Sequence, residues 1–150
     1  MKNQSNTALR LVGIALLALV IGTTVSCKKE KLPPTADQYI KALEDVARNY
    51  NGECPKSLAD GSTLTAVTFE GKTMTYRMEI SDEAMSIMNK QYLDSTVRDS
   101  LIQSMSDKLK EYFIKGDCDV TYKYVSPNDS CSLNIIPKEL GELASEEEKK

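Results

Sequence analysis

Residues 64–80, with the sequence LTAVTFEGKTMTYRMEI, decide the fold, because apolar and polar side chains alternate on both sides of Glu70-Gly71. Alternation with a period of two is typical of a half-buried strand. A two-residue turn that contains glycine is typical of a β-hairpin. We therefore expect two antiparallel strands joined at Glu70-Gly71, with Val67 opposite Met74. A slip of one residue would mix the two faces, so the alternation itself supports the hairpin.

A second hairpin is predicted further along the chain, where Ser126-Pro127-Asn128-Asp129 has the composition of a type I turn. Its strands would pair Tyr124 with Cys131, Tyr122 with Leu133 and Val120 with Ile135. Each hairpin then has an apolar face for the core and a polar face. The polar face of such a sheet is usually open to solvent, and its alternative role is to bind a partner or a glycan. The candidate binding face consists of Thr73, Thr75, Arg77, Thr121 and Lys123.

Helical segments precede each hairpin. Thr35 and Gln38 predict a capping box, and apolar residues then recur at helical spacing as far as Tyr50. Ser81 is the predicted N-cap of a second segment, whose helical spacing continues to Phe113.

This second segment is too long to be one helix packed on the sheet. It would measure about 45 Å at 1.5 Å per residue, whereas the predicted strands measure about 25 Å. We expect a break near Asp94-Ser95-Thr96 and two helices that fold back on each other. The predicted fold is α+β, in the order α-ββ-αα-ββ. It contains a four-stranded antiparallel sheet with helices packed on one face.

The first 26 residues have the features of a secretory signal peptide. Lys2 and Arg10 precede an uncharged, mostly apolar stretch over residues 11–25, and the small residue Ser26 follows it. The apolar core is shorter than the roughly 20 residues that a membrane-spanning helix needs. Cys27 comes directly after the predicted cleavage site.

The box Thr24-Val25-Ser26-Cys27 resembles the lipid-attachment box of bacterial lipoproteins. That box usually reads Leu, then Ala or Ser, then Gly or Ala, before the cysteine, so Ser26 fits the pattern and Thr24 departs from it. The resemblance implies that Cys27 carries a thioether diacylglycerol and an acylated amino group. Several acyl chains anchor a protein without a transmembrane helix. The alternative is an ordinary signal peptide followed by a cysteine by chance.

The residues after Cys27 bear on the location of the protein. No Asp follows Cys27 directly, which resembles the pattern of lipoproteins that are passed to the outer membrane. We therefore expect a lipid-anchored cell-envelope protein on the periplasmic side of the outer membrane. The predicted organisation is a signal peptide (1–26), an anchor and linker (27–34), a single domain (35–140) and a charged tail (141–150).

Composition narrows the possible functions. Cleavage after residue 26 leaves 124 of the 150 residues and removes Lys2 and Arg10, which changes the net charge from −3 to −5. An acidic domain of this kind is a poor nucleic-acid binder. The chain has no histidine, which removes the commonest general base and metal ligand. We predict no cofactor and no metal site.

Three cysteines remain besides Cys27, and an oxidising compartment favours a disulfide. Cys118 and Cys131 lie too far apart along the second hairpin to be bonded. Cys54 pairs with Cys118 if the helical segment doubles back, and with Cys131 if it crosses the sheet as one helix. We predict the bond between Cys54 and Cys118, with Cys131 as a buried thiol.

Residues 50–136 resemble short cell-envelope lipoproteins that carry a Cys-Pro loop followed by Tyr-rich strands. That resemblance brings no known activity. We expect a non-catalytic binding or accessory role, with membrane lipid bound through the acylated Cys27 and a possible protein partner. The alternatives are an inhibitor or structural subunit of an envelope assembly that acts through an edge strand, and an envelope hydrolase that uses carboxylates.

Overall fold

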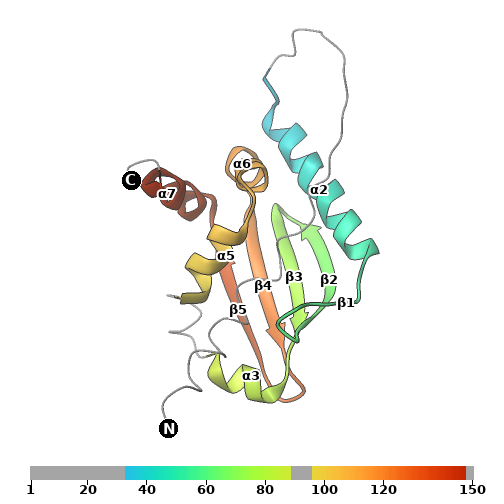
Figure 1. Cartoon of the computed structure of the whole chain (residues 1–150). Coiled ribbons are helices and arrows are strands. Elements are labelled where there is room, and N and C mark those ends of the chain that lie inside the picture. The colour runs from blue at the N-terminus through green and yellow to red at the C-terminus, as the bar shows by residue number, and fades with distance from the viewer. Residues whose placement is uncertain (1–32, 89–95, 148–150) are drawn as a thin grey trace.

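The computed structural model describes residues 33–88 and 96–147, which form a five-stranded sheet with associated helices (Figure 1). The predicted signal peptide, Cys27 and the predicted helix break near Asp94 lie outside the described residues. In chain order the elements are α2 (Ala36–Gly52), β1 (Lys56–Ser57), β2 (Thr63–Glu70), β3 (Thr73–Glu79), α3 (Asp82–Ile87), α5 (Arg98–Ser104), α6 (Asp107–Gly116), β4 (Asp119–Val125), β5 (Ser130–Ile135) and α7 (Pro137–Glu147).

The α+β class is confirmed, but the four-stranded antiparallel sheet is wrong in two respects. The strand order is β1-β2-β3-β4-β5, and the central pair β3 and β4 is parallel, with Tyr76 beside Tyr122. The prediction assumed that the chain leaves and re-enters the sheet at the same end. In the structure α6 ends beside the start of β3, so that Asp119 pairs with Thr73. A connection that returns the chain to the starting end of the sheet makes the next strand parallel.

The fifth strand is β1, which was not predicted. Lys56 and Ser57 pair with Leu64 and Thr63 at the outer edge of β2. The intervening loop is tight, because the N–H of Leu58 donates to the Ser62 carbonyl (2.9 Å).

The first hairpin forms as predicted, but its turn lies one residue further along the chain. Gly71 and Lys72 occupy the centre of the turn with φ of 55° and 67°, as a type I′ turn requires. Val67 consequently lies opposite Tyr76 instead of Met74. Because the pairing changes by an even number of residues, the side chains from Val67 to Glu79 keep their predicted faces.

A β-bulge between Leu64 and Ala66 changes the side-chain pattern of β2. An extra residue in one strand shifts the alternation by one position. Leu64 and Val67, three residues apart, are therefore both 2% exposed and both face the core.

The second hairpin confirms the predicted register in full: Tyr124 pairs with Cys131, Tyr122 with Leu133 and Val120 with Ile135. The loop is closed by the Ser126 N–H, which donates to the Asp129 carbonyl (2.9 Å).

The helix starts follow their capping residues. The backbone N–H of Thr35 donates to Gln38 Oε1 (3.0 Å) before α2, and Ser81 Oγ accepts from the Ala84 N–H (3.1 Å) before α3. One break was not predicted: α5 ends at Ser104, and Ser106 starts α6 by accepting from the Leu109 N–H (3.3 Å).

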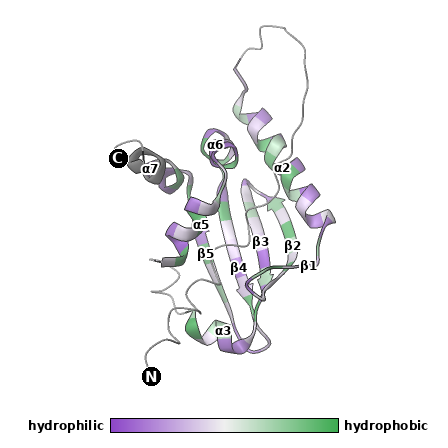
Figure 2. Cartoon of the chain, in the orientation of Figure 1, coloured by the Kyte–Doolittle hydropathy of each residue, from purple (hydrophilic) through white to green (hydrophobic). Residues whose placement is uncertain are grey.

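The core lies between one face of the sheet and the helices. The helix layer runs from α2 through α6 to α7, and α2 also packs on β2 (Figure 1). Hydrophobic and hydrophilic residues are interleaved along the strands and α2, which leaves one sheet face polar (Figure 2). Tyr76 and Tyr122 stack at the centre of the core, with ring centroids 5.1 Å apart. None of the helices within 33–88 and 96–147 is long and apolar enough to span a membrane.

Candidate functional site

The structure brings the five residues of the candidate binding face together on the polar face of β3 and β4. Thr75 lies beside Thr121 and Arg77 beside Lys123 in the parallel register, and Thr73 lies at the start of the same face of β3. Residues on this face are half-buried or exposed, whereas the alternate residues of both strands are buried.

The edge strand β5 offers a second candidate site. Cys131, Leu133 and Ile135 are directed into the ladder with β4, because in an antiparallel pair alternate residues point both backbone groups toward the partner strand. The backbone groups of Ser130, Ser132 and Asn134 therefore point away from the sheet. The side chains that reach two of these groups agree with this assignment. Asp129 Oδ1 accepts from the Ser130 N–H (2.7 Å), and Arg98 Nη1 donates to the Asn134 carbonyl (2.9 Å).

Between these two contacts the edge is uncovered among the described residues. The outward N–H and carbonyl of Ser132 have no partner there, and Ser132 is exposed. An unpaired N–H and carbonyl on an edge strand can pair with a strand of another chain. The β5 edge can thus accept a short added strand centred on Ser132.

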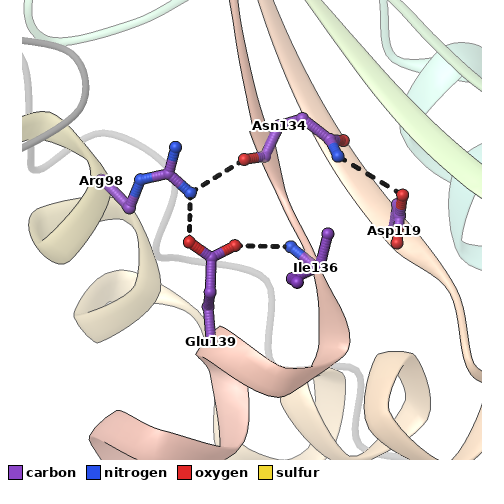
Figure 3. Close-up of polar contacts among 5 residues, drawn as sticks. All are labelled: Arg98, Asp119, Asn134, Ile136 and Glu139. Carbon is purple, nitrogen blue, oxygen red and sulfur yellow. Dashed lines mark hydrogen bonds and ion pairs between the residues drawn. The ribbon is translucent and has the colours of Figure 1, made fainter.

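Arg98 fixes one end of this edge (Figure 3). Its Nη1 atom contacts both the Asn134 carbonyl (2.9 Å) and Glu139 Oε1 (2.5 Å). The other carboxylate oxygen, Glu139 Oε2, accepts from the Ile136 N–H (2.8 Å) at the start of α7. The side chain of Asn134 donates to Asp119 Oδ2 (3.3 Å) on β4. These contacts join α5, β5 and α7, so Arg98 and Glu139 position the edge.

Sequence reasoning did not single out Arg98 or Glu139. Glu139 could have been found, because Pro137 followed two residues later by Glu139 is typical of the first turn of a helix. For Arg98 the sequence holds no such signal, since its partners are 36 and 41 residues further along the chain.

A groove of about 290 Å³ lies between α2 and α6. Its apolar lining is formed by Ala42, Val46, Tyr50, Leu109 and Tyr112. The acidic residues at the groove are already paired within the chain: Asp45 with Arg48 and Glu53 with Lys56, both at 2.9 Å. The groove therefore carries no unmatched acidic charge that would identify a ligand.

The predicted disulfide between Cys54 and Cys118 is not formed, because Cys54, Cys118 and Cys131 are free thiols in the structure. Cys54 precedes β1, which lies beside the end of β2 paired with Met78, whereas Cys118 directly precedes the residue paired with Thr73. These positions are about 15 Å apart along β3 alone at 3.3 Å per residue, and a disulfide needs Cα atoms within about 7 Å. The alternative Cys54–Cys131 would have to span the whole width of the sheet.

Burial favours the neutral forms of the tyrosine hydroxyl and cysteine thiol groups in the core. Burial raises the pKa of the Tyr76, Tyr122 and Tyr124 hydroxyl groups, so they stay protonated at neutral pH. Burial likewise raises the pKa of Cys118, which disfavours the reactive thiolate. No group of three metal-ligating side chains occurs within the described ranges.

No known family model matches the sequence, and no curated protein matches it. Two solved structures share the fold. One is a candidate secreted protein from Pseudomonas aeruginosa, with 18% identity and a TM-score of 0.58 over 70% of this chain and 95% of the other. The second is EpsS, the pilotin of the type 2 secretion system of Vibrio vulnificus, with 10% identity and a TM-score of 0.56 over 70% and 94% of the two chains. At these identities the likeness shows a common fold.

Proposed function

We propose that this chain is a lipid-anchored, non-catalytic accessory protein of a bacterial cell envelope. It is held in the membrane through Cys27 and binds a protein partner that adds a strand to β5. The signal peptide and the Cys27 box support the anchor. The fold shared with a candidate secreted protein and a secretion-system pilotin supports an accessory role in the envelope.

The open centre of the β5 edge is the observation that carries the partner proposal. Asp129 and Arg98 occupy the two ends of the edge and leave Ser132 between them. An extended segment can pair with Ser132 through its main chain, which is the usual mode of strand addition. The side chains at the ends limit the added strand to a few residues.

The anchor proposal includes the location. Without an Asp after Cys27, the acylated protein would pass to the outer membrane and face the periplasm. The residues that follow Cys27, Lys28-Lys29-Glu30-Lys31, place positive charge next to the acyl chains, where each Lys contributes about 1 kcal/mol of attraction to anionic headgroups. Pro33-Pro34 then acts as a stiff spacer ahead of α2.

A proline substitution at Ser132 tests the edge, because it removes an N–H that points away from the ladder. The wild-type protein, Ser132→Pro and Ser132→Ala are each purified from membranes after cross-linking, and the recovered partners are compared. We expect one stoichiometric partner with the wild type and with Ser132→Ala, and its loss with Ser132→Pro. Equal recovery with Ser132→Pro contradicts strand addition, provided that the variant melts within a few degrees of the wild type.

The intact mass of the membrane-extracted protein tests the anchor separately. Acylation predicts a chain that starts at Cys27 and carries the mass of a diacylglycerol and a further acyl group. A product that retains Met1, or that starts at Cys27 without added mass, contradicts the anchor. The Cys27→Ser variant should leave the membrane fraction, and its fold should be unchanged because the box lies before α2.

A further inference from the structure

The polar face of the sheet holds two cations side by side, and nothing in the proposed function uses them. Arg77 on β3 and Lys123 on β4 are direct neighbours in the parallel register, where adjacent strands are about 4.8 Å apart. Like charges next to each other on neighbouring strands are destabilising. Within the described residues neither side chain has an ion-pair partner. This arrangement leaves an unmatched positive charge on a chain that is acidic overall.

The surroundings leave both cations accessible to a ligand. The same row across the sheet continues to Ala66 on one side and to Ser132 on the other, so small side chains flank the pair. Arg77 is half-buried and Lys123 is exposed. A planar guanidinium next to an ammonium can offer several N–H donors to one anion, and such charge-assisted hydrogen bonds are the strong ones.

The neighbouring row of the same face consists of uncharged polar groups. Thr68, Thr75, Thr121 and Asn134 lie beside one another across β2, β3, β4 and β5. Thr121 Oγ1 donates to Asn134 Oδ1 (2.8 Å), which holds the end of the row. The hydroxyl groups of Thr68 and Thr75 have no partner among the described residues. A ligand placed on this face thus meets cations in one row and hydroxyl groups in the next.

The backbone of this face is unavailable to a ligand, because β3 and β4 are central strands with a neighbour on both sides. Peptides recognise sheets through main-chain hydrogen bonds at an edge, and protein partners rely on apolar anchors in pockets. The two rows supply neither. The acidic side chains Glu70, Glu79 and Asp119 are also strand residues near these rows, which disfavours a broad anionic membrane surface.

We propose that Arg77 and Lys123 bind the carboxylate of an acidic glycan, with the uncharged part of the sugar chain lying over the row of Thr68, Thr75 and Thr121. The site goes beyond the strand addition proposed for β5 and does not depend on it. Hydroxyl groups that both donate and accept hydrogen bonds suit sugar hydroxyls. The two cations would orient the chain through one carboxylate group.

The probe is the tetramer of galacturonic acid, titrated into the full-length protein in a neutral detergent and followed by calorimetry. Maltotetraose serves as the uncharged sugar, and tetraglutamate serves as the acidic peptide. We expect binding of the galacturonate tetramer with at least about tenfold lower Kd than either comparison probe. The binding should weaken with added salt, as expected for a charged contact.

The variant Arg77→Gln with Lys123→Gln should raise the Kd for the galacturonate tetramer about tenfold or more, since each charge-assisted hydrogen bond contributes on that scale. The control is Lys41→Gln with Lys138→Gln, which removes the same charge from α2 and α7 and should change the Kd less than twofold. Three results would overturn the proposal: no binding of the galacturonate tetramer, equal or tighter binding of tetraglutamate, or an unchanged Kd in the Arg77 and Lys123 double variant.

Discussion

The two edges of the sheet differ in how far the chain itself covers them. At the β2 edge, the two-residue strand β1 pairs with Thr63 and Leu64, and Asn51 Oδ1 at the end of α2 accepts from the Val67 N–H (3.1 Å). At the β5 edge, the cover that the described residues provide consists of the side chains of Asp129 and Arg98 at the two ends. An edge strand left open invites pairing with another chain, so proteins usually cover such edges.

The two edges also differ in where their cover comes from in the sequence. The β2 edge is covered by elements close to it in sequence, so its protection forms together with the hairpin. The β5 edge depends on Arg98, which comes from another part of the chain. A single side chain there covers one carbonyl, and within 33–88 and 96–147 no contact covers Ser132, on which the proposed strand addition rests.

Proline substitutions on β5 give the largest expected effect and distinguish the inward from the outward residues. Leu133→Pro removes a ladder hydrogen bond to β4 and a side chain that is 1% exposed. We expect it to destabilise the fold by about 3 kcal/mol or more. Ser132→Pro, one residue away, removes only an outward N–H and should cost far less. Urea unfolding of both variants checks this contrast.

A comparable loss of stability in the two proline variants would show that the outward assignment of Ser132 is wrong. The variant Leu133→Ala separates the two parts of the larger effect, because it deletes the side chain and keeps the N–H.

Removal of Arg98 tests the covered end of the β5 edge. Arg98→Ala breaks the contacts to the Asn134 carbonyl and to the Glu139 carboxylate. The Arg98 side chain is 21% exposed and the Glu139 side chain 31% exposed. We expect a loss of about 1–2 kcal/mol, since hydrogen bonds to charged groups contribute on that scale when they are partly buried. Chemical denaturation gives the value. Arg48→Ala, whose side chain is 75% exposed beside Asp45, should cost less than about 0.5 kcal/mol.

The local part of this fold could be predicted from the sequence, and the long-range part could not. The register of β4 and β5 was predicted correctly because Tyr122, Tyr124, Leu133 and Ile135 alternate around a clear turn. The faces of β2 and β3 were also correct, although Gly71 allows more than one turn position and the chosen one was a residue off. Hydrophobic alternation defines which side chains share a face, but does not define how two hairpins are placed relative to each other.

The parallel pairing of β3 with β4 depends on the path of the chain between Glu79 and Asp119, which no local pattern reports. The disulfide prediction was wrong for the same reason, since it was derived from an assumed hairpin arrangement. Of the candidate sites, the polar face was found because alternation places its residues together. The contact that covers one end of the β5 edge was not predicted, because Arg98 lies 36 residues before Asn134 in the sequence.

Asn51 tests the covered edge of β2. Asn51→Ala leaves the Val67 N–H without its partner at the edge of the sheet. We expect a loss of about 1 kcal/mol, the usual net contribution of one hydrogen bond, and faster hydrogen exchange at the Val67 amide. Asn49→Ala, which changes another exposed asparagine of α2, is the control. Unchanged exchange at Val67 would show that β1 alone protects this edge.

The smallest expected effect concerns pH and the loop that leads into β5. Asp82 accepts from the Asn128 N–H (3.2 Å) and from Asn128 Nδ2 (2.6 Å), which joins the start of α3 to that loop. Hydrogen bonds from Ser126 and Asn128 hold the pKa of the exposed Asp82 carboxyl below its usual value of 3.8. Because the folded state favours the charged form of Asp82, the stability that this carboxylate adds is fully present above pH 3.8 and is lost as the pH falls through the lower pKa of the folded state.

The wild type should therefore be slightly more stable than Asp82→Asn at neutral pH and should lose this advantage at the acid end of a melting series between pH 7 and 2. The control is Asp37→Asn, which removes an acidic charge from the first turn of α2, where there is no contact to Asn128. A constant difference between the wild type and Asp82→Asn over the whole series would mean that the carboxylate does not hold the loop, and the start of the β5 edge would then depend on Asp129 alone.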